Sequence, residues 1–186
     1  MTFPKSTTIL TTHQNHKNSD NQAIQAIKTA VAKPKTPQLR LIECEFPPLQ
    51  ALNKLGDGSL QSAKQVDAAN LAFGAKCCKA LSPLLGNRPT LLTSSSATAS
   101  FVQQAQKAFG QTASLKNGPP QGTTRSDIFV LVAPSGRDYV VAKQLATQGA
   151  TVVLINGFAK VRPNLVSFSA CPFCILTLLP LELKGQ

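Results

Sequence analysis

The chain has 186 residues, of which 42 % are apolar and 15 % are charged. These proportions are typical of a globular protein and exclude a disordered or fibrous chain. The length predicts one domain with a terminal extension. No apolar run approaches the roughly 20 residues that a membrane-spanning helix needs, so we predict no transmembrane segment.

The net charge of +11 favours anionic partners. Nucleic-acid binding typically needs clustered basic residues and aromatic side chains that stack on bases. Here the basic residues are scattered, and the phenylalanines fall at core-like positions. We therefore expect an acidic protein surface or an anionic lipid rather than nucleic acid. The alternative is that the charge only keeps the chain soluble.

Residues 1–38 are rich in Ser, Thr, Asn, Gln and Lys and contain a single acid. Ser-rich, acid-poor composition is typical of organelle transit peptides, so we predict a flexible leader here, with the character of an organelle transit segment. Within it, Ile24, Ile27 and Val31 have helical spacing. A short amphipathic helix ended by Pro34 is therefore the alternative interpretation.

Strands and helices alternate over residues 39–157. Apolar runs predict four strands, at 38–46, 89–93, 128–134 and 150–156. Helical spacing and capping residues predict three helices between them: one that begins at 59 and is ended by Pro83 and Gly86, one at 95–110 and one at 135–149. This order indicates an α/β fold with an open, mostly parallel, doubly wound (Rossmann-like) sheet.

Two details of this region matter below. The longest predicted helix has one apolar face, formed by Ala63, Val66, Asn70, Phe73, Cys77 and Leu81. The segment 111–127 is rich in Gly, Pro, Ser and Thr, and we predict an exposed, mobile loop there.

Residues 158–186 break the pattern, because they hold three prolines and have no helical period. We therefore predict an atypical C-terminal segment, truncated or altered, and a sheet that is incomplete at this end. Strand 150–156 would then expose an apolar edge, and such edges recruit other chains.

Two Ser-rich loops follow predicted parallel strands, at 93–98 and 133–138. Ligands of open α/β sheets bind at the carboxyl ends of the strands, so these loops predict a pocket for a phosphate or a carboxylate. Ordinary helix capping by Ser is the alternative. The "GDGS" at 56–59 favours a turn with an N-cap over a phosphate loop. The candidate anion-binding residues are Ser94, Ser95, Ser135, Gly136 and Arg137.

Cys171 and Cys174 have the C-x-x-C spacing of a redox pair, and they are the candidate redox residues of the chain. A zinc site would need two further ligands at suitable spacing, and none is present. The five cysteines are odd in number and irregularly spaced, which is not the pattern of a disulfide scaffold. We recognise no catalytic set and expect no cofactor and no metal.

The strings "EFPPLQALNKLGDGSLQSAKQVDAANLAF", "DIFVLVAPSGRDY" and "VVLIN" resemble a plastid family of plants and algae. Its domain, of unknown function, occurs in the low-photosystem-II-accumulation protein three and appended to a chloroplast adenylate kinase. The resemblance covers about residues 39–157. It implies a nuclear-encoded protein of the chloroplast, in the stroma or at the thylakoid periphery.

Two functions from different classes follow. The first is a non-enzymatic interaction domain that assists photosystem II assembly, with photosystem II subunits or assembly factors as the protein partners that the resemblance implies. The second is a small-molecule, phosphate or nucleotide-binding domain linked to phosphoryl transfer, which would use the two Ser-rich loops.

Overall fold

The computed structural model describes residues 16–32, 41–45, 60–85, 89–157, 166–171 and 174–178. The helices are α1 (His16–Ala32), α2 (Leu60–Leu85), α3 (Ala99–Ala108), α4 (Asp138–Thr147) and the short 3-10 helix η2 (Leu115–Asn117). The strands are β1 (Leu41–Glu45), β2 (Thr90–Thr93), β3 (Thr112–Ser114), β4 (Ile128–Val132), β5 (Thr151–Ile155), β6 (Val166–Cys171) and β7 (Cys174–Leu178).

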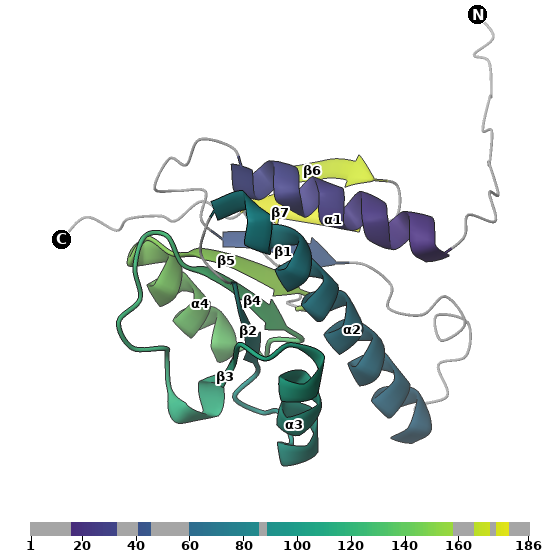
Figure 1. Cartoon of the computed structure of the whole chain (residues 1–186), viewed down its shortest axis with the longest axis vertical. Coiled ribbons are helices and arrows are strands. Elements are labelled where there is room, and N and C mark those ends of the chain that lie inside the picture. The colour runs from purple at the N-terminus through teal and green to yellow at the C-terminus, as the bar shows by residue number, and fades with distance from the viewer. Residues whose placement is uncertain are drawn as a thin grey trace, which may run out of the picture.

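The strands form one open sheet in the order β3-β2-β4-β5-β1-β7-β6 (Figure 1). Strands β1 to β5 are parallel, and β4 and β5 are buried along their whole length. The chain moves from β1 through β2 to β3 and then returns through β4 to β5 beside β1. This reversal is the doubly wound topology, so the predicted α/β fold class is confirmed.

The sheet does not end at β5, contrary to the prediction of an exposed edge at 150–156. Strand β5 lies between β4 and β1. The outer side of β1 pairs with β7, and β7 pairs with β6, in both cases antiparallel. An antiparallel hairpin needs only a short turn, whereas a further parallel strand would need a long crossover. The C-terminal segment therefore covers the edge without the helix that the sequence lacks.

Two hydrophobic layers cover the two faces of the sheet. Side chains of α1, α2 and α3 pack on one face, against Ile42, Val130 and Val153 among others. Side chains of α4 and η2 pack on the other, against Leu41 and Leu131 among others. The two sets of strand residues alternate along each strand, as the pleat requires.

Helix α1 is part of this packing, so the flexible-leader interpretation does not apply to residues 16–32. Its residues Ala23, Ile27 and Val31 are at most 1 % exposed. The helix lies across α2 and the β1, β7 and β6 end of the sheet (Figure 1). The predicted amphipathic pattern is therefore the one that the fold uses, while residues 1–15 and Pro34 lie outside the described residues.

Helix α2 buries the predicted face from Asn70 onward, and Phe73 is 2 % exposed. Its first turns extend past the sheet, and Ala63 is exposed. The helix continues through Pro83 and ends at Leu85, directly before Gly86. The predicted caps at residues 57 and 59 lie outside the described residues.

The predicted loop 111–127 contains β3 and η2 at its start, so it is not a loop throughout. Strand β3 has the sequence Thr-Ala-Ser, which lacks the apolar run of a buried strand. All three of its side chains are half-buried, because β3 is the end strand of the sheet.

Gly74 lies where α2 comes closest to the sheet. A Cβ atom placed on it would lie 2.5 Å from Cγ2 of Val132 and 3.2 Å from Cδ1 of Leu91. Both neighbours belong to the buried core, where there is little room to move. The close approach of helix and sheet therefore depends on the missing side chain.

We predict that Gly74→Ala lowers the free energy of unfolding by about 1–3 kcal/mol, which is the usual cost of overpacking. Helix propensity alone would give the opposite sign, since Ala is favoured over Gly by about 1 kcal/mol. Urea unfolding measures the change. Gly110→Ala is the matched control, because a Cβ there has no neighbour within 4 Å. In a Val132→Ala background the Gly74→Ala penalty should shrink; an unchanged penalty would contradict the packing argument.

Candidate functional site: the carboxyl edge of the parallel sheet

The two Ser-rich loops meet at the point where the chain reverses direction in the sheet. One loop follows β2 and the other follows β4, and these strands are neighbours. The first leads into α3 and the second into α4, which lie on opposite faces of the sheet. A doubly wound sheet forms its ligand-binding crevice at such a reversal.

The Asp138 side chain lies between the loops and joins them. From the first loop, Ser94 Oγ donates to its Oδ2 (2.5 Å), and the Ser95 backbone N–H donates to its Oδ1 (3.0 Å). From its own loop, the N–H and the hydroxyl of Ser135 each donate to Oδ2 (2.7 Å). Asp138 is 1 % exposed. The carboxylate therefore holds the place that a bound anion would take at these donors.

These hydrogen bonds fix the charge state of Asp138. Burial acts to raise the pKa of this carboxyl group, but the hydrogen bonds from Ser94, Ser95 and Ser135 outweigh it and hold the pKa below its ordinary value. Asp138 is also in the first turn of α4, where the positive end of the helix dipole favours an acid. The group is therefore an ionised, internal anion at neutral pH.

Three of the five predicted anion-binding residues are thus brought together, namely Ser94, Ser95 and Ser135. Gly136 and Arg137 follow them in the chain but are exposed. Binding of an external anion by these residues stays a prediction. The sequence signal for the loop geometry was the capping-box spacing of Ser135 and Asp138, and nothing local indicated that Asp138 also bonds the β2 loop.

A second polar group at this edge was missed by sequence reasoning. The Tyr139 hydroxyl donates to Glu43 Oε1, and both side chains are buried. Gly157 makes room for this pair, because a Cβ there would overlap the Tyr139 hydroxyl oxygen and lie 3.0 Å from Glu43 Oε1. Nearby, Asn156 Nδ2 donates to Asn70 Oδ1 (2.7 Å) and ties the end of β5 to α2.

Most of the buried polar side chains in the described ranges gather at this edge. The exception is Thr151, at the amino end of β5. The backbone is also unusual here: Ala133 and Asn156, which follow β4 and β5, have positive φ angles of 46° and 51°. Such angles are uncommon outside glycine. The members of this edge are Glu43, Asn70, Thr93, Ser94, Asp138 and Asn156.

Thr93 differs from the other members, because its Oγ1 is buried and has no hydrogen-bond partner among the described residues. An unpaired buried hydroxyl costs roughly 1–3 kcal/mol.

The candidate redox pair lies on the antiparallel hairpin, beside the carboxyl end of β1, because Ile175, which follows Cys174, pairs with Glu45. Cys171 ends β6 and Cys174 begins β7, and the strand register pairs them. Their side chains lie outside the described residues, and a redox role stays a prediction. Of the described cysteines, Cys44, Cys77 and Cys78 are buried thiols, and burial raises the pKa of the Cys78 thiol to about 12.

Within the described ranges, no group of three or more His, Cys, Asp or Glu side chains could hold a metal ion. None of the described helices has an apolar stretch long enough to cross a bilayer.

We predict that Asp138→Asn lowers the free energy of unfolding by roughly 2–4 kcal/mol at pH 7, because hydrogen bonds to a charged group are lost. The folded-state pKa is depressed, so this stabilisation is present above the ordinary carboxyl pKa and is lost as the pH falls through the folded value. The gap between wild type and variant should therefore narrow below about pH 4. Urea unfolding across pH measures it.

Asp127→Asn is the matched control for this prediction. Asp127 accepts the N–H of Thr124, three residues before it, as Asp138 accepts the N–H of Ser135, but this bond of the Asp127 side chain stays within its own turn. Its replacement should cost less. Equal costs for the two variants would show that the bonds between the loops contribute nothing.

Comparison with known families assigns the chain to one of them. A family model described as a domain of unknown function, DUF1995, matches residues 15–167. The match includes α1 and reaches the start of β6, so it extends beyond residues 39–157 at both ends. Neither the comparison with curated proteins nor the comparison with solved structures found a match. Since the family match spans most of the chain, the chain belongs to the DUF1995 family, a domain of unknown function.

Proposed function

We propose that the protein is a non-enzymatic plastid factor, in the chloroplast stroma or at the thylakoid periphery, that assists photosystem II assembly by binding other proteins. The family membership and the resemblance of "APSGRDY" and its flanking strings to the plastid proteins support the setting. The nature of the site supports the mode of action.

The observation that carries the proposal is the position of Asp138. At the crevice where related topologies bind a phosphate or a nucleotide, the donors of Ser94, Ser95 and Ser135 already bond a carboxylate of the chain itself. An incoming anion would have to displace a group that is tethered, and it would meet the negative charge of Asp138. This arrangement favours a structural role for the crevice and a role for the protein as a binding module.

The surface charge supports an acidic partner. Outside the core, the described side chains include nine basic groups and three acidic ones, Asp20, Asp67 and Asp127. Asp20 is already paired with Lys76, at 2.5 Å. A surface of this kind attracts partners of negative charge and speeds their encounter. The basic groups are Lys28, Lys64, Lys76, Lys79, Lys107, Lys116, Lys143, Arg125 and Arg137.

The proposal predicts that the full chain, tagged at its C-terminus and expressed in a plant or an alga, localises to the chloroplast. It also predicts that mild affinity purification followed by mass spectrometry recovers photosystem II subunits or assembly factors in excess over an untagged strain. Location in another compartment would overturn the plastid assignment. A chloroplast protein that recovers none of these proteins would overturn the assembly role.

The alternative function is small-molecule or phosphate binding linked to phosphoryl transfer. The observation that favours it is that the two loops lie together at the reversal point of the sheet. A ligand that binds only the folded state raises its stability in proportion to ln(1 + [L]/Kd). Our proposal predicts an unchanged melting temperature in millimolar inorganic phosphate or ATP. An upward shift that Ser135→Ala removes would favour the alternative.

A further inference from the structure

Strand β3 is the end strand of the sheet, and its outer side carries backbone groups that β2 does not use. The C=O of Gln111 accepts from the N–H of Leu91, and the register places Thr112 opposite Leu91 and Ala113 opposite Leu92. In a parallel pair, successive residues of one strand turn their N–H and C=O groups alternately toward and away from the partner. Ala113 therefore faces β2, and Thr112 and Ser114 face outward.

A hollow of about 300 Å³ lies beside this outer side. Val102 and Gln106 of α3 form one wall, and residues 117–120 form the other. The strand itself forms part of the lining, through Thr112, Ala113 and Ser114. The hollow thus gives access to the edge of β3 from solvent, with an apolar side chain and an amide group on the α3 wall.

The chemistry of this surface indicates which kind of molecule can bind there. Outward N–H and C=O groups at two-residue spacing match the backbone of an extended segment, which pairs with an exposed edge as an added strand. Prolines 119 and 120 line the hollow and have no backbone N–H, so these two residues do not compete for the strand's carbonyl groups.

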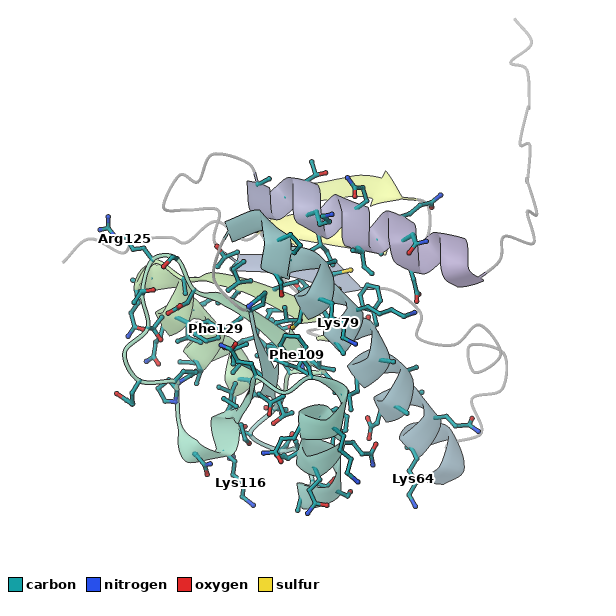
Figure 2. The ribbon with its side chains drawn as sticks, in the orientation of Figure 1. Lys64, Lys79, Phe109, Lys116, Arg125 and Phe129 are labelled. Carbon is teal, nitrogen blue, oxygen red and sulfur yellow. The ribbon has the colours of Figure 1, made fainter. Side chains whose placement is uncertain are left out.

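The residues that neighbour the lining in the chain, here called the rim, carry positive charge. Lys107 follows Gln106 on α3, and Lys116 precedes Asn117 of the other wall; both are exposed. Lys116 extends from η2 into solvent (Figure 2). The lining holds no acidic residue. Acidic side chains on an extended segment would therefore be complementary to both sides of the hollow.

We propose that the free edge of β3 and the hollow beside it bind an extended, acidic segment of a partner protein by strand addition. This inference rests on the proposed role as an interaction protein and specifies the surface that serves it. A second copy of the chain is not the occupant, because edge-to-edge pairing of two copies would bring Lys107 and Lys116 of each against those of the other.

The test uses the full chain and a short fluorescein-labelled peptide in which glutamate and valine alternate, measured by fluorescence anisotropy. We expect binding to the glutamate peptide and none to the same peptide with lysine in place of glutamate. The glutamate peptide with N-methyl groups on every residue should not bind, because neither edge of its backbone can then donate to the β3 edge. Equal binding of the N-methylated peptide would overturn strand addition.

Variants locate the site. Lys107→Glu and Lys116→Glu together should weaken binding of the glutamate peptide by roughly tenfold or more. Lys143→Glu, on the exposed side of α4 and outside the lining of the hollow, is the control and should bind as the wild type does. If Lys143→Glu weakened peptide binding as much as the double variant, the peptide would be attracted by net charge alone, and the proposed site would be overturned.

Thr112→Pro removes one outward N–H and leaves the β2 ladder intact, since proline is tolerated on edge strands. This variant should also weaken binding of the glutamate peptide. If the variant fails to fold, the comparison between the peptides still tests strand addition. Photosystem II proteins captured equally by wild type and by folded Thr112→Pro would overturn the β3 site and leave the proposed function standing. Peptide binding without any such capture in plastids would uphold the site and overturn the photosystem II role.

Discussion

A buried carboxylate must find hydrogen-bond donors, and in this chain that requirement organises the centre of the fold. Asp138 accepts from both loops that end at the reversal point of the sheet, and it does so from the first turn of α4. The doubly wound topology splits the chain at this point, because one loop leaves toward α3 and the other toward α4. Without an acceptor between them, the hydroxyl and N–H groups of Ser94, Ser95 and Ser135 would need water or a ligand.

Two further pairs of buried polar side chains at the carboxyl edge are also hydrogen-bonded. The Glu43 carboxylate receives the Tyr139 hydroxyl, and Asn156 reaches across to Asn70 of α2. These pairs connect helices on both faces to the strand ends, so they hold the layers in register. Such hydrogen-bonded polar pairs stabilise one arrangement of the core over others. Other proteins of this topology bind ligands at this edge, but here the chain's own side chains largely occupy it. A partner would therefore bind at the periphery of the sheet.

The sequence predicts those parts of the fold whose burial is complete. Strands β4 and β5 are continuous apolar runs because both of their faces are covered, and α2 has helical spacing because one face is. It misses β3, whose residues are half-buried and carry no apolar pattern. The loop serines could be predicted from their places after strands, but the bond from Ser94 to Asp138 spans 44 residues and that from Tyr139 to Glu43 spans 96. No local pattern encodes contacts at such separations.

The two ends of the sheet differ in how the chain covers them, and this difference bears on function. At the β1 end, an antiparallel hairpin of β7 and β6 extends the sheet, and α1 packs over it. At the β3 end, the last strand has three residues, and the chain turns directly into η2. Short edge strands limit unwanted pairing between sheets, because they offer few groups in a row. They also suit a weak, selective partner, since a few backbone bonds become useful only when the flanking charges of Lys107 and Lys116 are matched. Selectivity at this end would then reside in the rim and not in the strand.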